Sequence, residues 1–155
     1  MFRWLGFEVE VLPDATRDQM LSSMRELASK DHSGMDCVAC IVLSHGLEGG
    51  VYGVDGGVVR LKKLKWYVNG EQCRSLIGKP KLFFIQAYQG TQVNGPSSPG
   101  DICSDAVVAS ELLPSTADFL TAMATTPSHV SVRLEDKGSW FIQSLCKNLV
   151  QLVPQ

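Results

Sequence analysis

Two apolar runs that end in polar residues decide the fold: CVACIVLSHG at residues 37–46 and KLFFIQAYQG at residues 81–90. The first part of each run is almost entirely apolar, which is typical of a central parallel strand covered on both faces. Each strand then passes into polar residues, Ser44-His45 after the first and Tyr88-Gln89 after the second. Because open α/β sheets bind ligands at the C-terminal ends of their strands, we expect a site where these two strands end.

Helix signals surround the two runs. Thr16 and Gln19 have the spacing of a capping box and precede apolar residues at helical spacing, which predicts a helix that ends near Asp31. Ser139 is expected to cap a final helix, in which apolar residues again recur at helical spacing. The other expected elements are strands over residues 7–12, 119–125 and 130–133, a hairpin over 51–61 and a short helix over 61–68.

Length and composition favour one globular domain. The 155 residues are 45% hydrophobic and 19% charged, which is enough for a real core. The net charge of −2 gives no cationic field to attract nucleic acid or anionic lipid, so we expect neither nucleic acid nor membrane as a partner. No stretch approaches the roughly 18 apolar residues of a membrane span and no signal peptide is visible, so we expect a cytoplasmic location.

The five cysteines are odd in number and scattered, which is typical of free thiols in a reducing compartment. Cys37 and Cys40 form a C-x-x-C motif, a spacing that also occurs in redox and zinc sites. Within the first strand, however, these two positions point to opposite faces, so packing in the core is the favoured interpretation. We expect no metal and no organic cofactor.

The second run carries a family signature. FFIQAYQG at residues 83–90 is similar to the caspase pattern Gln-Ala-Cys-[Arg/Gln/Gly]-Gly, with Tyr88 at the position of the cysteine. The family pattern places a histidine roughly 50 residues upstream, and His45 precedes position 88 by 43 residues. The chain therefore resembles the caspases, above all the initiator caspases of the death-receptor pathway and their inactive relative, the FLICE-inhibitory protein. Further matches lie at residues 35–37, 43–46, 78–81, 117–120 and 138–146.

The resemblance implies an α/β fold, a three-layer α-β-α sandwich around a mostly parallel central sheet, incomplete at both ends. Residues 1–90 would be a large-subunit-like region and residues 115–155 the start of a small-subunit-like region, within one structural domain. Between them, residues 91–114 are rich in Pro, Ser, Gly and Asp and are expected to form an exposed inter-subunit linker. The family's first strand, a second pocket arginine and the last strands, one of which pairs across a dimer, are not found.

The resemblance also assigns roles to residues near the two strand ends. It implies that His45 is the catalytic histidine and that the backbone N–H of Gly46 belongs to the oxyanion hole. It places Gln86 and Arg133 in the pocket that receives a substrate aspartate, a task that suits the planar fork of arginine. Further expected positions are Ser44 for substrate binding, and Asp105 and Asp101 for processing in the linker. Trp140 is expected either in the wall of the substrate pocket or in the core.

Tyr88 is the departure from the family that decides the expected function. A thiol near pKa 8.5 can be drawn to thiolate, whereas a phenol titrates near pKa 10 and carries its oxygen farther from the backbone. The ring would also occupy the space that the scissile bond needs. Loss of the nucleophile from such a unit typically costs about a millionfold in turnover. Val130 and Val132 replace aromatic residues beside Arg133, which predicts a shallower peptide groove.

Three functions are open at this point. The first is a catalytically inactive caspase homologue that regulates apoptosis in death-receptor signalling, by binding an initiator caspase or its adaptor complex, with a heterodimer as one form. The second is an active cysteine-type endopeptidase that cleaves after aspartate. The third is a nonfunctional fragment. The identity of residue 88 favours the first and argues against an enzyme.

Overall fold

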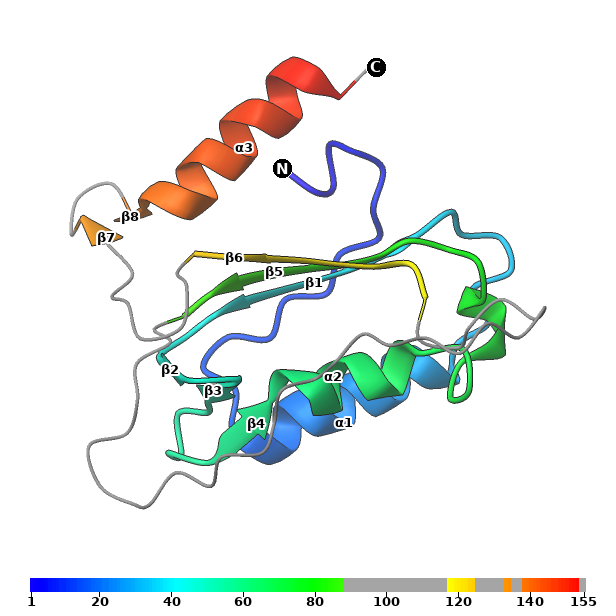
Figure 1. Cartoon of the computed structure of the whole chain (residues 1–155), viewed down its shortest axis with the longest axis horizontal. Helices are drawn as coiled ribbons and strands as arrows, with labels where there is room; N and C mark the ends of the chain where they lie inside the picture. The colour runs from blue at the N-terminus through cyan, green and yellow to red at the C-terminus, as the bar shows by residue number, and fades with distance from the viewer. Residues whose placement is uncertain (88–116, 125–132, 135–137, 154–155) are drawn as a thin grey trace.

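Parallel strands form the centre of the fold. The sheet has the order β1 (Val38–Leu43), β5 (Lys81–Gln86) and β6 (Phe119–Met123), and both pairs of neighbours are parallel. The two apolar runs are parallel strands, as the sequence predicted, and the structure shows that they are neighbours. The computed structural model describes residues 1–87, 117–124, 133–134 and 138–153 (Figure 1).

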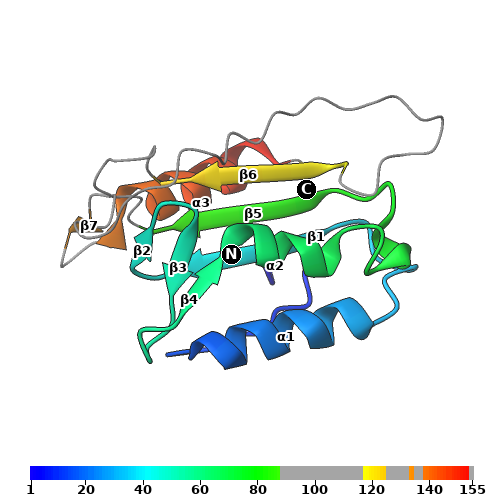
Figure 2. The same ribbon diagram turned by 60° about the horizontal axis from the view of Figure 1, so that its bottom comes forward.

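Helices lie on both sides of this sheet. α1 (Arg17–Ser29) and α2 (Leu61–Val68) lie side by side on one face, and α3 (Trp140–Leu152) lies on the other side (Figures 1 and 2). This order of helix, sheet and helix confirms the predicted α/β class. None of the described helices is long and apolar enough to cross a membrane.

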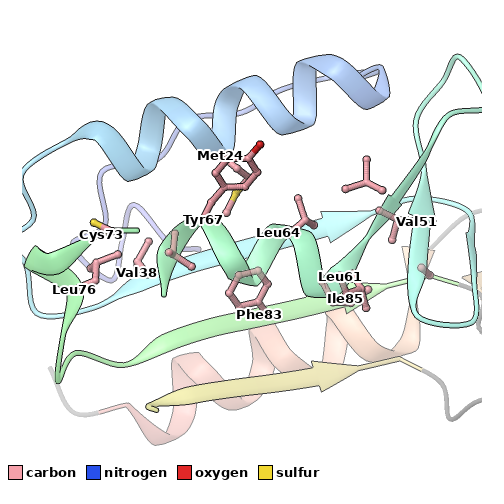
Figure 3. Close-up of a cluster of buried hydrophobic side chains, with 13 residues drawn as sticks. Met24, Val38, Val51, Leu61, Leu64, Tyr67, Cys73, Leu76, Phe83 and Ile85 are labelled. Carbon is pink, nitrogen blue, oxygen red and sulfur yellow. The ribbon is translucent and has the colours of Figure 1, made fainter. Parts of the chain in front are cut away.

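The core lies between the sheet and the helices α1 and α2 (Figure 3). Phe83 and Ile85 of β5 point into it and are each 1% exposed. They belong to one cluster with Met24 of α1 and with Leu64 and Tyr67 of α2. Full burial of one such side chain contributes about 1.5–3 kcal/mol, so this layer is a main source of stability.

The other face of the sheet is covered less evenly. Phe84 is buried, and the ring of Phe2 lies 5.9 Å from it between centroids. Ile41 and Leu43 of β1 point to this same face and are 38% and 64% exposed. The expectation that β1 is covered on both faces is therefore wrong for these residues, because the segment that covers Phe84 leaves Leu43 exposed.

A small antiparallel sheet connects the end of β1 to α2. It consists of β2 (Gly46–Leu47), β3 (Gly50–Tyr52) and β4 (Val58–Arg60), which confirms the predicted hairpin. The turn of the hairpin packs against the start of α1, because a Cβ on Gly53 would lie 2.4 Å from the backbone nitrogen of Arg17. No side chain fits in that space, so glycine allows the close approach of the hairpin to the helix.

Asp55 fastens this turn to α1 through hydrogen bonds. Its carboxylate Oδ1 accepts from the backbone N–H of Arg17 at 3.1 Å and from that of Gly57 at 3.2 Å. The bond from Arg17 is the main cause that lowers the pKa of the Asp55 carboxyl. Because the first N–H groups of a helix have no partner within it, the carboxylate supplies one of the missing acceptors.

Both predicted helix caps are present. The backbone N–H of Gln19 donates to Thr16 Oγ1 at 3.2 Å, and that of Thr16 donates to Gln19 Oε1 at 2.9 Å, which is a complete capping box. α1 ends at Ser29, within two residues of its predicted end. At the start of α3, Ser139 Oγ accepts from the backbone N–H of Ile142 at 3.1 Å.

One predicted strand does not form. Residues 7–12 alternate apolar and polar side chains, yet they adopt no regular secondary structure. A strand needs a neighbour to take up its backbone hydrogen bonds, and in the described ranges no strand pairs with this segment. The predicted strand over 130–133 is represented by β7 (Arg133–Leu134), while residues 130–132 and the linker at 91–114 lie outside the described residues.

Candidate active site

The C-terminal ends of β1 and β5 meet at one edge of the sheet, as the sequence predicted. Leu43, the last residue of β1, is in register with Gln86, the last residue of β5. Beyond this pair, the backbone N–H of Ser44 donates to the carbonyl oxygen of Gln86 at 3.0 Å. The residues that follow the two strands therefore leave the sheet from adjacent points.

The backbone after β1 is held by β3. The N–H of Tyr52 donates to the carbonyl of His45 at 2.8 Å, and the hydroxyl of Ser44 donates to the carbonyl of Tyr52 at 2.6 Å. Gly46 pairs with Val51 in the ladder between β2 and β3, and it is buried. His45, in contrast, is exposed. The fold thus presents the His45 imidazole to solvent from a backbone that β3 holds in place, at the strand end where the sequence predicts the catalytic histidine.

The hydroxyl of Ser44 has a structural partner, because it ties the end of β1 to the hairpin through Tyr52. The sequence did not predict that the backbone carbonyl of Tyr52 accepts this hydrogen bond. The signal that could have found it is the short segment between His45 and the hairpin, since a hairpin that follows a strand so closely must fold back beside it. The assignment of Ser44 to substrate binding stays a prediction.

The second half of the candidate site follows β5. Gln86 is partly buried at the end of the strand, and Ala87, which follows it, is 2% exposed. Tyr88 comes directly after Ala87 and lies outside the described residues. The two strand ends therefore bring His45 and Gln86 to the same edge, and the chain continues from that edge into Tyr88.

Arg133, the third predicted site residue, belongs to the C-terminal part of the chain. It lies in β7, which pairs antiparallel with β8 (Gly138–Ser139), with Arg133 in register with Ser139. This short ladder lies at the end of the molecule toward which the strands of the central sheet run (Figures 1 and 2). Trp140 follows as the first residue of α3 and is 59% exposed, so it is not part of the core. The two processing candidates, Asp101 and Asp105, lie outside the described residues.

The cysteines of the C-x-x-C motif are poor nucleophiles. Cys40 packs against the core, and burial raises the pKa of its thiol to about 12. Desolvation, followed by the charge of Asp36, also raises the pKa of the Cys37 thiol. The position of Cys40 therefore agrees with the predicted core packing, whereas Cys37 is only half-buried.

Among the residues that the structure describes, no group of three or more His, Cys, Asp or Glu side chains is placed to hold a metal ion.

Comparisons with a family model and with individual curated proteins identify the same family. Residues 1–152 match the family described as Caspase domain. The chain is 44% identical over 148 residues to caspase-3 of Mus musculus, 41% identical over 155 residues to caspase-7 of Gallus gallus, and 40% identical over 163 residues to caspase-8 of Rattus norvegicus. These alignments cover 96%, 96% and 99% of this chain, but 53%, 49% and 34% of the respective relatives. The chain thus spans about half the length, or less, of these three curated relatives.

Proposed function

The chain belongs to the caspase family, and we propose that it is a protease-dead member that regulates apoptosis in death-receptor signalling. The observation that carries this proposal is the tyrosine at position 88, where the family signature has its cysteine. A caspase-type reaction needs a thiolate beside the histidine to attack the peptide carbonyl. A phenol at that position has the wrong reactivity and carries its oxygen too far from the backbone.

The thiols of Cys37, Cys40 and Cys73 offer no replacement nucleophile. A replacement nucleophile would have to ionise close to neutral pH, and burial holds the pKa of Cys40 at about 12. The pKa of Cys37 is raised as well, and Cys73 is buried in the core on the α1 and α2 side of the sheet. His45 remains exposed at the end of β1. The site as proposed retains the general base and the aspartate-binding residues Gln86 and Arg133, without a nucleophile.

The proposed partner is an initiator caspase or its adaptor complex, bound in the cytoplasm as a heterodimer. The resemblance to the FLICE-inhibitory protein supports this partner, because an inactive homologue with the family fold can occupy the place of an active subunit. Cleavage of the linker after Asp105, or after Asp101, by the partner caspase would yield two associated pieces. Both positions lie in the segment of residues 91–114 that is rich in small and polar residues.

The first test compares turnover by the unmodified chain, by Tyr88→Cys and by Tyr88→Phe on a fluorogenic peptide that ends in aspartate. The unmodified chain and Tyr88→Phe are expected to show the same background rate, because neither side chain can perform acyl transfer. Any turnover by the unmodified chain that is lost in His45→Ala would overturn the protease-dead assignment.

The second test measures the regulatory part of the proposal. The unmodified chain is titrated into an active initiator caspase, and the rate of that caspase on the same peptide is followed. A saturable change in rate supports regulation, and the appearance of two fragments of the chain supports cleavage in the linker. An unchanged rate at saturating chain concentration would remove the regulatory role while leaving the protease-dead assignment intact.

A further inference from the structure

A basic groove lies on the helical side of the molecule, apart from the strand ends. Two shallow hollows, with volumes of about 470 Å³ and 300 Å³, open there. The larger is lined mainly by residues of α1 and α2, and the smaller by residues of α2 and by Arg60, the last residue of β4. Lys63 and Trp66 of α2 line both hollows. Because the two hollows share Lys63 and Trp66, we treat them as one surface and call it the α1–α2 groove. The helices α1 and α2 lie side by side in both views (Figures 1 and 2).

The α1–α2 groove is strongly positive in a chain that is negative overall. Arg25 from α1 lines the larger hollow, and Arg60 and Lys62 line the smaller one, together with the shared Lys63. The described residues that line the two hollows include no Asp or Glu. The net charge of the whole chain is −2, so the groove is a local concentration of positive charge. Charge complementarity of this kind selects an anionic ligand.

Lys63 is held in a defined position in this groove. Its ammonium nitrogen lies 3.8 Å from the ring centroid of Trp66 and 5.1 Å from that of Tyr67. Cation–π attraction at such distances restrains a side chain that is otherwise flexible. A restrained cation loses less conformational entropy when it binds a carboxylate, which favours binding. Trp66 is 39% exposed and adds an apolar contact surface beside the charge.

We propose that the α1–α2 groove binds an acidic peptide segment of a partner protein. Carboxylates of such a segment accept hydrogen bonds from the guanidinium N–H groups of Arg25 in the larger hollow and of Arg60 in the smaller one. One N–H of Arg60 donates to the backbone carbonyl of Glu48 at 3.0 Å, so the carboxylate meets the other N–H groups of Arg60. This site is independent of Tyr88 and of the proposed regulatory function.

Two other anionic partners fit this groove less well. Nucleic acid binding relies on open aromatic rings on which bases stack, whereas the Lys63 ammonium already lies over Trp66 and Tyr67 is buried. An amphipathic helix that binds a membrane surface inserts its apolar face, whereas α2 buries Leu61 and Leu64 in the core. A peptide needs neither open stacking faces nor a free apolar stripe.

The test uses the full chain and a fluorescein-labelled synthetic peptide in which glutamate alternates with glycine. Binding is measured by fluorescence polarisation, and the site is located by the chemical shift of the Trp66 indole N–H. The double variant Arg25→Gln with Lys63→Gln is expected to weaken binding about five- to tenfold. The matched variant Arg3→Gln with Lys147→Gln removes the same charge elsewhere and is expected to change binding by less than about twofold. Thermal unfolding of both variants checks that they are folded.

The following outcomes would overturn the proposal. They are no binding of the glutamate peptide, equal weakening by both double variants, an unmoved Trp66 signal at saturation, and tighter binding of an oligothymidylate of equal charge or of phosphatidylserine vesicles. Equal binding of the same peptide with glutamine in place of glutamate also counts against it, because the carboxylates would then play no part. Tyr88→Cys is expected to bind the peptide as the unmodified chain does, which separates this result from the test of protease activity.

Discussion

The two faces of the central sheet differ in how the same strands are covered. On the side of α1 and α2, Phe83 and Ile85 of β5 are each 1% exposed in a continuous core. On the other side, Phe84 is buried, but Leu43 of β1 and Leu120 of β6 are 64% and 53% exposed. An apolar composition alone therefore does not determine whether both faces of a strand are buried. Burial depends on which amphipathic element packs against each face, and α1 and α2 do this more completely than the N-terminal segment and α3.

The largest effect is expected from a cavity on the α1 and α2 side. Phe83→Ala removes a ring that is 1% exposed and lies 6.0 Å from the ring of Phe119 between centroids. The expected loss in the free energy of unfolding is about 3–5 kcal/mol, measured by chemical denaturation. Phe83→Leu is the control and should cost much less. A loss below about 1 kcal/mol for the alanine variant would contradict the assignment of this face as the main core.

The junction between the hairpin and α1 should give the next largest effect. Gly53→Ala places a methyl group 2.4 Å from the backbone nitrogen of Arg17, so the hairpin must move away from the helix. The expected cost is about 1–3 kcal/mol of unfolding free energy. Gly34→Ala is the matched control, because nothing lies within 4 Å of its added Cβ. Equal melting temperatures for the two variants would show that the hairpin is not fixed against α1.

Acid should weaken the same junction. The pKa of Asp55 is lowered in the folded chain, chiefly by the hydrogen bond from Arg17, so its contribution to stability is present above the unfolded pKa. That contribution is lost as the pH falls through the folded pKa. Asp55→Asn should therefore melt at a lower temperature than the unmodified chain at neutral pH, with a difference that shrinks as the pH falls through the lowered pKa of Asp55. A difference that is constant with pH would contradict the role of the carboxylate.

The smallest effect is expected on the open face. Leu43→Ala should change the free energy of unfolding by less than about 0.5 kcal/mol, because the side chain is already 64% exposed. The same substitution at Leu64, which is 2% exposed, should cost about 2–5 kcal/mol. Similar losses of unfolding free energy for the two variants would contradict the proposed difference in burial between the two faces.

Local signals in the sequence predicted most of the elements. The capping box at Thr16 and the cap at Ser139 involve residues close in sequence, so the helices that they begin could be placed without tertiary information. The apolar runs also located β1 and β5 and the edge where they end. The strand predicted over residues 7–12 failed because strand formation depends on a neighbour, which alternation of side chains does not supply.

The candidate site was predictable in its residue types and less so in its contacts. The polar residues after β1 and β5 followed from the rule that parallel strands end at a common edge, and Ser44 and Gln86 do meet there. The hydrogen bonds of Tyr52 to Ser44 and His45 depend on the path of the hairpin in space, which no short motif encodes. Exposure of Leu43 likewise depends on coverage by distant segments.

The proposal that Tyr88 leaves the chain without a catalytic nucleophile is tested most directly by covalent labelling. The unmodified chain is incubated with a peptide aspartyl fluoromethyl ketone, which alkylates an activated catalytic nucleophile, and its intact mass is measured beside an active initiator caspase. We predict that the caspase gains one label while the mass of this chain does not change. A label on this chain that requires His45 and maps to Tyr88 or to a cysteine would contradict the protease-dead assignment.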